Sequence, residues 1–295
     1  MTFPKISIVT PSYNQGEFLE ETILSVLGQN YPNLEYIIID GGSTDNSIDI
    51  IKKYENQLSY WESNKDNGVY DAVQKGFAKS TGEIMAWINS DDMYHPKSFL
   101  TIAEVFNNFP EIHWLQGNPS GFDELGRNVA LRPLRLWSRY NYYLNDFEYI
   151  QQESTFWRRS LWEQAGSAFN PTLKYAADLD LWLRFFRYER LYVTEALLAG
   201  FRFRRSNQLS LDNREAYLKE ALFCIDHEEL DENTKNRLAA IRKWKNILSF
   251  LNHFEIGRIK LKYYNLFDYP PQVKFNRSTQ RFELKSWVDF KLTKS

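Results

Sequence analysis

Two adjacent carboxylates, Asp91 and Asp92, follow a short apolar run and are the sharpest chemical feature of the chain. Their mutual repulsion disfavours folding unless a cation or hydrogen-bond donors compensate it. Mg²⁺ or Mn²⁺ would do so, because these ions bind one or two carboxylates together with substrate phosphates and water. The alternative is a polar turn in which Asp92 caps the following helix.

A third carboxylate, Asp178, stands at the start of an amphipathic helical pattern that runs to Tyr188. The positive end of a helix favours the ionised form of an acid, which a general base needs before it takes a proton from a hydroxyl. Asp180 lies on a different helix face, so we expect only one of the two in a cleft. The alternative is that Asp178 serves only as the helix N-cap.

Tyr13 and Asp40 are candidates for binding a nucleoside. Asp40 precedes the run Gly-Gly-Ser-Thr-Asp at 41–45, whose glycines allow close backbone approach and whose hydroxyls offer hydrogen bonds. The Tyr13 ring is suited to stacking on a base. The alternatives are a helix-entry loop at 40–45 and a packing role for Tyr13.

An alternation of strand and helix patterns positions these residues. Apolar runs predict strands at 5–10, 35–40, 58–62 and 83–89, and helical patterns follow at 18–27, 47–54, 69–79 and 96–106. This alternation predicts a mostly parallel sheet covered by helices. The polar residues after such strands converge on one cleft.

The alternation of strand and helix patterns stops after a short strand predicted at 114–116. Residues 117–132, with a turn at 123–126, predict a β-hairpin at the edge of the sheet. Strands are expected at 154–157 and 191–198, a helix at 178–188, and two helices from 214 to about 253.

Composition excludes several classes of protein. The chain has 295 residues and 43% hydrophobic residues, which is enough for one large α/β domain or two modest ones. The net charge of -2 argues against a nucleic-acid partner. Because Cys224 is the single cysteine and no apolar run approaches the roughly 18 residues that span a bilayer, we expect a cytoplasmic protein.

Four ordered segments resemble glycosyltransferase family 2, which has the GT-A fold. They read ISIVTPSYN at 6–14, IDGGSTD at 39–45, NSDD at 89–92 and DLDLWL at 178–183. The resemblance implies an α/β fold in which a Rossmann-like, mostly parallel sheet is flanked by helices. It implies a GT-A domain at 1–212, with a nucleotide-sugar half at 1–117 and an acceptor half at 118–212, followed by a helical, basic and aromatic extension at 213–295.

The resemblance also implies an inverting, metal-dependent transfer of a sugar from a nucleotide diphosphate donor, most commonly a UDP-sugar, to a saccharide. Asp178 would be the catalytic base. Asp92 would bind Mn²⁺ or Mg²⁺, and Asp91 would contact the ribose or the metal. The nucleoside would be held by Thr10, Tyr13 and Asp40.

Further contacts follow from weaker similarities. Asn67 and Asp71 lie in a stretch similar to enzymes that build bacterial surface polysaccharides, and we expect them to contact the donor. Arg205 or its neighbour Arg204 falls near a position where many members carry histidine, and an arginine there would neutralise phosphate. The alternative is that these arginines cover an acidic surface.

Gln152, Glu153 and Trp157 lie on or beside a predicted strand, and we expect them to bind the acceptor. Two departures, Gly41 in place of an acid and Ala177 in place of a glutamate, leave a catalytically inactive nucleotide-sugar-binding relative as an alternative. A sugar nucleotidyltransferase fits less well, because residues 11–16 do not form a glycine-rich phosphate loop.

The C-terminal segment is strongly basic and aromatic. Residues 235–295 carry 14 Lys and Arg against 4 Asp and Glu. Such a segment is suited to a membrane surface or to a lipid-linked saccharide acceptor, as in polysaccharide or O-antigen synthesis. We therefore expect peripheral membrane contact through this extension, with a packed extension or an oligomer contact as the alternative.

Overall fold

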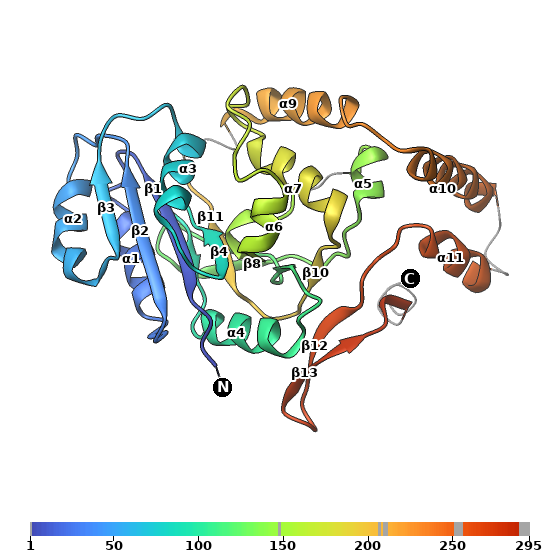
Figure 1. Ribbon diagram of the computed structural model, residues 1–295, viewed down its shortest axis with the longest axis horizontal. Helices are drawn as coiled ribbons and strands as arrows, with labels where there is room; N and C mark the ends of the chain where they lie inside the picture. Colours follow the sequence, from blue (N-terminus) through green and yellow to red (C-terminus); the bar gives the residue numbers. More distant parts are fainter. Residues whose placement is uncertain (1, 147–148, 206–207, 209–211, 251–255, 289–295) are drawn as a thin grey trace.

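A seven-stranded sheet forms the centre of the computed structural model, which describes residues 2–146, 149–205, 208, 212–250 and 256–288 (Figure 1). Its strand order is β10-β6-β9-β4-β1-β2-β3. These strands are β1 (Ile6–Ser12), β2 (Leu34–Asp40), β3 (Tyr60–Ser63), β4 (Ile84–Trp87), β6 (Trp114–Gln116), β9 (Thr155–Arg158) and β10 (Tyr192–Val193). The predicted mostly parallel sheet is confirmed; only β9 runs antiparallel to its neighbours, β4 and β6.

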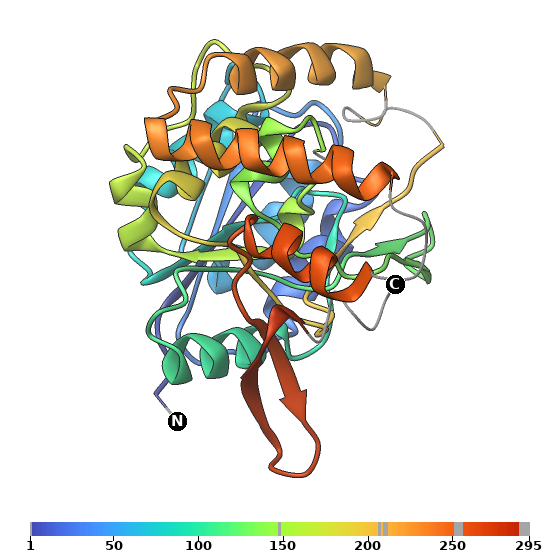
Figure 2. The ribbon, with the colours of Figure 1, turned by 90° about the vertical axis from the view of Figure 1, so that its right-hand side faces the viewer.

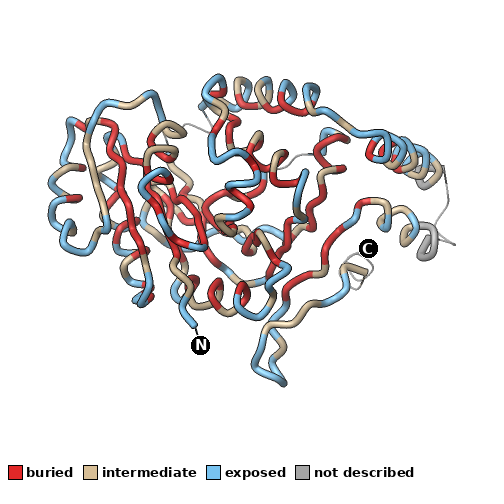
Figure 3. Tube along the Cα trace, in the orientation of Figure 1, coloured by how far each residue is buried: buried red, intermediate tan, exposed pale blue. Residues whose placement is uncertain are grey.

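Helices cover both faces of this sheet. One face packs on α1 (Leu19–Leu27) and α4 (Ser98–Asn108), and the other on α3 (Val69–Lys79), α6 (Arg159–Gln164) and α7 (Ala177–Tyr188), while α2 (Ser47–Tyr54) flanks α1. Neighbouring residues of β1 divide between the two cores: Ile8 faces α1 and α4, and Val9 faces α3. All of β1 is therefore buried (Figure 3), as expected for a strand covered on both faces.

A second, four-stranded sheet lies beside the first. It has the order β5-β11-β7-β8, with β5 at Met93–Tyr94, β11 at Ala199–Arg202, β7 at Ser120–Phe122 and β8 at Asn128–Leu131. The predicted hairpin at 117–132 is confirmed as β7 and β8, but its predicted place at the edge of the main sheet is wrong. β10 pairs with β6 at that edge, and β7 pairs instead with β11.

The C-terminal extension is packed against the domain. It contains α9 (Arg214–Asp226), α10 (Glu232–Phe250), α11 (Ile256–Asn265) and a hairpin of β12 (Gln272–Asn276) and β13 (Arg281–Lys285). The two predicted helices are confirmed, although His253 lies outside the described residues; the hairpin was not predicted. Figure 2 shows α10 and α11 side by side, with the hairpin projecting below them. Among the described residues, no helix combines the length and apolar character needed to cross a bilayer.

Close packing of α3 on β1 generates a stability prediction. A Cβ added at Gly76 in α3 would overlap the side chain of Val9. Replacing a helical glycine by alanine normally gains about 1 kcal/mol, whereas overpacking costs about 1–3 kcal/mol. We expect Gly76→Ala to lower the free energy of unfolding in urea by roughly 1 kcal/mol. In a Val9→Ala background the same substitution should stabilise the protein; equal effects in both backgrounds would show that this contact is not tight.

Candidate active site

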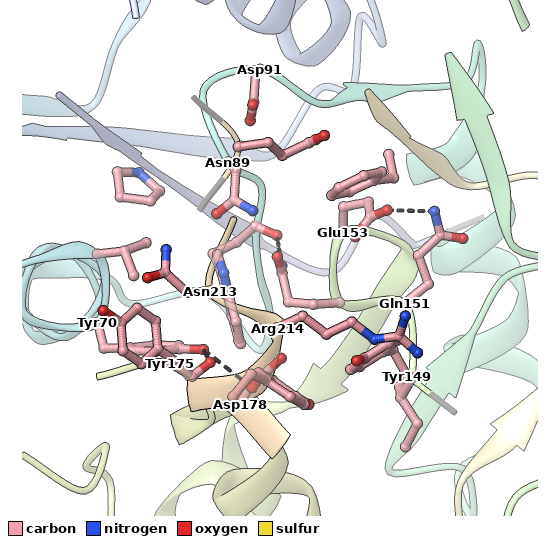
Figure 4. Close-up of a pocket in the computed structure, with 18 of the residues that line it drawn as sticks. Tyr70, Asn89, Asp91, Tyr149, Gln151, Glu153, Tyr175, Asp178, Asn213 and Arg214 are labelled. Carbon is pink, nitrogen blue, oxygen red and sulfur yellow. Dashed lines mark hydrogen bonds between the residues drawn. The ribbon is translucent and has the colours of Figure 1, made fainter. Parts of the chain in front are cut away.

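A cavity of about 1760 Å³ opens where β1, β3 and β4 end at their carboxyl edge. Loops from the second sheet, the start of α7 and the C-terminal extension complete its wall. Figure 4 shows Asn89 and Asp91 on one side, and Tyr70, Tyr175 and Asp178 on another. Large concave sites with a few convergent polar groups are the usual place of ligand binding.

The three residues predicted to hold a nucleoside lie in different surroundings. Tyr13 lines the cavity and the residue is 60% exposed. Thr10 is buried with its hydroxyl 3.1 Å from that of Tyr36. Asp40 is buried as well, and its Oδ2 accepts hydrogen bonds from the backbone N–H of Ser43 at 2.8 Å and from the hydroxyl of Ser63 at 2.6 Å. Asp40 therefore orders the loop after β2, and of the three only Tyr13 reaches the described cavity wall.

An acid that was not predicted, Asp66, takes a place beside Gly41. Asp66 lines the cavity, and a Cβ at Gly41 would lie 2.8 Å from its Oδ2. Its other oxygen, Oδ1, accepts the backbone N–H of Gly68 at 2.9 Å. The loop after β3 thus places a carboxylate beside position 41, where the chain itself has glycine. The polar run at 64–67 was the only sequence signal for it.

Asn67 and Asp71, the predicted donor contacts, both line the cavity. The Oδ2 of Asp71 accepts the backbone N–H of Asn67 at 3.0 Å and pairs with Lys75 at 3.0 Å. Burial raises the pKa of Asp71, but the hydrogen bond from Asn67 and the Lys75 charge outweigh it and hold the pKa below its usual value. Asp71 is therefore ionised, and its hydrogen bond from the N–H of Asn67 joins the first turn of α3 to the loop before it.

The adjacent acids Asp91 and Asp92 point to different places. Asp91 lines the cavity, and its Oδ2 accepts from the guanidinium of Arg204 at 3.0 Å. Asp92 is 1% exposed, and its Oδ1 accepts the backbone N–H of Arg202 at 2.8 Å. Burial, together with the charges of Glu153 and Asp91, raises the pKa of Asp92 well above its usual value. The predicted metal ligand, Asp92, does not reach the cavity.

Because Asp92 does not reach the cavity, few of the described side chains there could bind a metal ion. Among the described residues, no group of three or more His, Cys, Asp and Glu side chains is arranged to hold an ion. Asp91 fits as a single carboxylate ligand, provided that phosphate oxygens and water complete the coordination, as is usual for Mg²⁺.

Of the two arginines predicted near the phosphate, Arg204 lines the described cavity and Arg205 does not. The side chain of Arg205 is 92% exposed and pairs with Glu124, with Nε 3.3 Å from Oε2. Arg204 is 10% exposed, lines the cavity, donates to Gln15 at 2.9 Å and lies over the ring of Phe18. The two neighbours therefore differ in exposure, and only Arg204 faces the described cavity.

Asp178 lines the cavity from the first turn of α7. Its Oδ1 accepts from the hydroxyl of Tyr70 at 3.1 Å and from the backbone N–H of Leu179 at 2.8 Å. The alternative role as N-cap does not apply, because Ala176 occupies that position. Burial raises the pKa of Asp178 to about 6, a value suited to a general base near neutral pH.

Two of the three predicted acceptor residues line the cavity. Gln152 and Glu153 lie in a short 3₁₀ turn before β9, and Gln151 donates to the carboxylate of Glu153. Burial raises the pKa of Glu153 to about 7. The third, Trp157, does not line the described cavity: it is fully buried within β9 and packs on Trp87, with ring centroids 5.6 Å apart.

Matches to known proteins agree with this arrangement. A family model described as Glycosyl transferase family 2 matches residues 7–162, more than half of the chain. The chain belongs to glycosyltransferase family 2. The matched residues of this family 2 glycosyltransferase include Tyr13, Asp66 and Asp91, whereas Asp178 lies beyond them.

Similar proteins include two uncharacterized glycosyltransferases. One from Nostoc sp. is 37% identical over 107 residues, which are 35% of this chain and 33% of the relative. One from Rickettsia prowazekii is 26% identical over 205 residues, which are 66% of this chain and 63% of the relative. The chain therefore spans less than two thirds of either relative.

The fold of this family 2 glycosyltransferase is similar to that of S. aureus TarS 1-349, solved in complex with UDP-GlcNAc. The TM-score is 0.63 at 20% identity, over 89% of this chain and 79% of that chain. The predicted GT-A fold is confirmed.

The hydrogen bond from Tyr70 generates a prediction for Asp178. The Tyr70 hydroxyl stabilises the ionised carboxylate, so Tyr70→Phe should raise the pKa of Asp178 above about 6. Titration of the ¹³C-labelled aspartate carboxyl by NMR measures this value. Tyr188→Phe, at the exposed end of α7, is the matched control and should leave it unchanged. A fall in the Asp178 pKa of the Tyr70→Phe variant would contradict the assigned direction of the hydrogen bond.

Proposed function

We propose that this family 2 glycosyltransferase transfers one sugar, with inversion, from a nucleotide diphosphate donor to a hydroxyl group of a saccharide acceptor. One observation carries the proposal: a carboxylate with a pKa near 6, Asp178, shares a cavity with Tyr13, Asp66 and Asp91. That combination supplies a base beside groups suited to a nucleotide and its diphosphate.

The donor would lie along the ends of β1, β3 and β4. The exposed ring of Tyr13 is free to stack on a base, and Asp66 and Asn67 offer hydrogen bonds from the loop after β3. Ser12 lines the cavity, and its buried hydroxyl has no hydrogen-bond partner in the described structure. A ribose hydroxyl would supply that partner. The TarS structures in complex with UDP-GlcNAc and UDP support a uridine donor.

The diphosphate would lie near Asp91 and Arg204. The guanidinium of Arg204 neutralises phosphate charge and holds the Oδ2 of Asp91 at 3.0 Å. We assign the contact to Mn²⁺ or Mg²⁺ to Asp91 in place of Asp92, because only Asp91 lines the cavity. Such an ion, when bound, offsets the charge that develops on the departing diphosphate.

Transfer would proceed as a single displacement. Asp178 takes the proton of the acceptor hydroxyl as that oxygen bonds to the anomeric carbon and the bond from this carbon to the diphosphate oxygen breaks. The electron pair leaves with the nucleoside diphosphate, and the incoming oxygen occupies the opposite face of the sugar. Burial keeps the Asp178 pKa near 6, so the group is ionised before the reaction and is still basic enough to accept the proton.

The acceptor would enter from the side of Glu153 and the extension. Arg132, Lys174, Arg214 and Lys260 line the cavity with positive charge, and Tyr264 adds an aromatic surface. This charge suits an acceptor that carries phosphate, and supports a lipid-linked saccharide used in polysaccharide or O-antigen synthesis. The basic extension would hold the enzyme at the inner membrane surface, from the cytoplasmic side.

A substitution of the base tests the mechanism. Asp178→Asn should lower kcat about 10²- to 10⁴-fold, because the amide cannot take the proton, while nucleotide binding is retained. Release of nucleoside diphosphate from a nucleotide-sugar panel, with a bacterial lipid extract as acceptor source, measures turnover. Asp180→Asn in the same helix is the control; Asp180 pairs with Arg184 at 3.0 Å and is not among the residues that line the cavity. Wild-type turnover of Asp178→Asn would remove it as the base.

A thermal-shift panel tests the donor and the metal ligand. A nucleotide that binds the native state adds roughly 2.7 kcal/mol of stability at about 100 times its Kd. We expect a Mn²⁺-dependent rise in Tm with one nucleotide diphosphate, lost in Asp91→Asn and kept in Asp92→Asn. Asparagine at 92 still accepts the Arg202 N–H, so the fold is maintained. The opposite pattern would return the metal contact to Asp92, and no response to any nucleotide would overturn the donor assignment.

A further inference from the structure

A glutamate of the C-terminal extension, Glu220 in α9, binds the backbone just ahead of the proposed base. Its Oε2 accepts the backbone N–H of Tyr175 at 2.8 Å and that of Ala176 at 2.9 Å. The N–H of Lys174 donates to both oxygens, at 3.1 and 3.2 Å. Three consecutive amides therefore converge on one carboxylate from a segment 44 to 46 residues away.

These amides belong to the entry of α7, which has no local cap. The N-cap residue is Ala176, which has no side-chain acceptor, and it is fully buried. N–H groups at the start of a helix need partners from outside the helix, and a negative charge there is favourable. Glu220 supplies this partner and this charge to the three N–H groups at 174–176, just ahead of the helix, while the N–H of Leu179 in the first turn is accepted by Asp178.

The loop held by Glu220 is connected to the base through Tyr70. The Tyr70 hydroxyl lies 3.0 Å from the carbonyl oxygen of Tyr175 and 3.1 Å from Oδ1 of Asp178. Figure 4 shows Tyr70, Tyr175 and Asp178 grouped at one wall of the cavity. A shift of the loop at 174–176 would move both the first turn of α7 and the group that hydrogen-bonds its carboxylate.

We propose that Glu220 is a positioning residue for sugar transfer, which fixes the entry of α7 so that the Asp178 carboxylate faces the acceptor hydroxyl. This inference rests on the function proposed above. It makes the extension part of the reaction's machinery, although Glu220 itself is not among the residues that line the cavity.

Glu220 also acts through its charge. Burial is the main cause that raises the pKa of Asp178, and the charge of Glu220 acts in the same direction. Other titratable groups facing Asp178 are kept neutral near pH 7, because burial raises their pKa: Tyr70 from α3, Tyr142 from α5 (Arg139–Tyr143), and Tyr217 and Cys224 from α9. Lys174 and Arg214 line the same cavity but are exposed, so solvent screens their charges.

Two substitutions separate the hydrogen bonds from the charge. Glu220→Gln keeps a carbonyl oxygen for the amides but removes the charge, so the pKa of Asp178 should fall below about 6. The acid limb of kcat/KM should then move to lower pH while kcat changes little. Glu220→Ala also removes the acceptor, and we expect kcat to fall about 10- to 100-fold with the donor KM unchanged.

Glu215→Gln is the matched control, because Glu215 is an exposed glutamate on the same helix. It should leave kcat and the pH profile unchanged. Wild-type kcat and an unshifted acid limb in both Glu220 variants would overturn the proposal. If thermal unfolding shows that Glu220→Ala does not fold, the acid limb of the kcat/KM profile of Glu220→Gln tests the proposal alone. A shift to lower pH supports it, and no shift overturns it.

A carboxyl titration by NMR keeps this test separate from the proposed function. If the wild-type protein transfers no sugar with any donor, the proposed function fails, but the pKa of Asp178 is still measurable in wild type and Glu220→Gln. A lower pKa in the variant supports the coupling of Glu220 to Asp178. An unchanged pKa overturns it.

Discussion

A carboxylate buried in a protein must accept hydrogen bonds from the chain around it, and this requirement shapes the loops of the cavity. Asp40 orders the loop after β2 through the N–H of Ser43, Asp92 joins the loop after β4 to β11 through the N–H of Arg202, and Glu220 holds the entry of α7. Backbone N–H groups therefore occupy oxygens of these three acids, and none of the three lines the cavity. The acids left for ligands, such as Asp91, are those whose oxygens face the cavity.

The strands and helices of the first half were predictable from the sequence because burial is periodic there. Strands covered on both faces read as continuous apolar runs, and the helices between them repeat their apolar residues every three or four positions. The order of strands after β6 was not predictable in the same way. β11 has only four residues and contains a glycine, and its partners β5 and β7 are distant in sequence.

The site was predictable to the level of a loop, but not of a single residue. Asp91 and Asp92, or Arg204 and Arg205, are equivalent by type, and which of each pair faces the cavity depends on the local direction of the backbone. Trp157 lies in the core for the same reason, since its strand directs the side chain away from the cavity. Arg214 and Glu220 had no local signal, because contacts across the fold bring the extension to the cavity.

The hairpin of β12 and β13 gives the extension a second attachment far from α9. Val273 in β12 is fully buried and pairs with Thr194, just after β10, in the core that also contains Ile8. The extension is thus fastened to both faces of the central sheet, through α9 on one and Val273 on the other. A segment fixed at both ends can accept changes of length and sequence between them, so α11, which contributes Lys260 and Tyr264 to the cavity, can change while the central sheet is maintained.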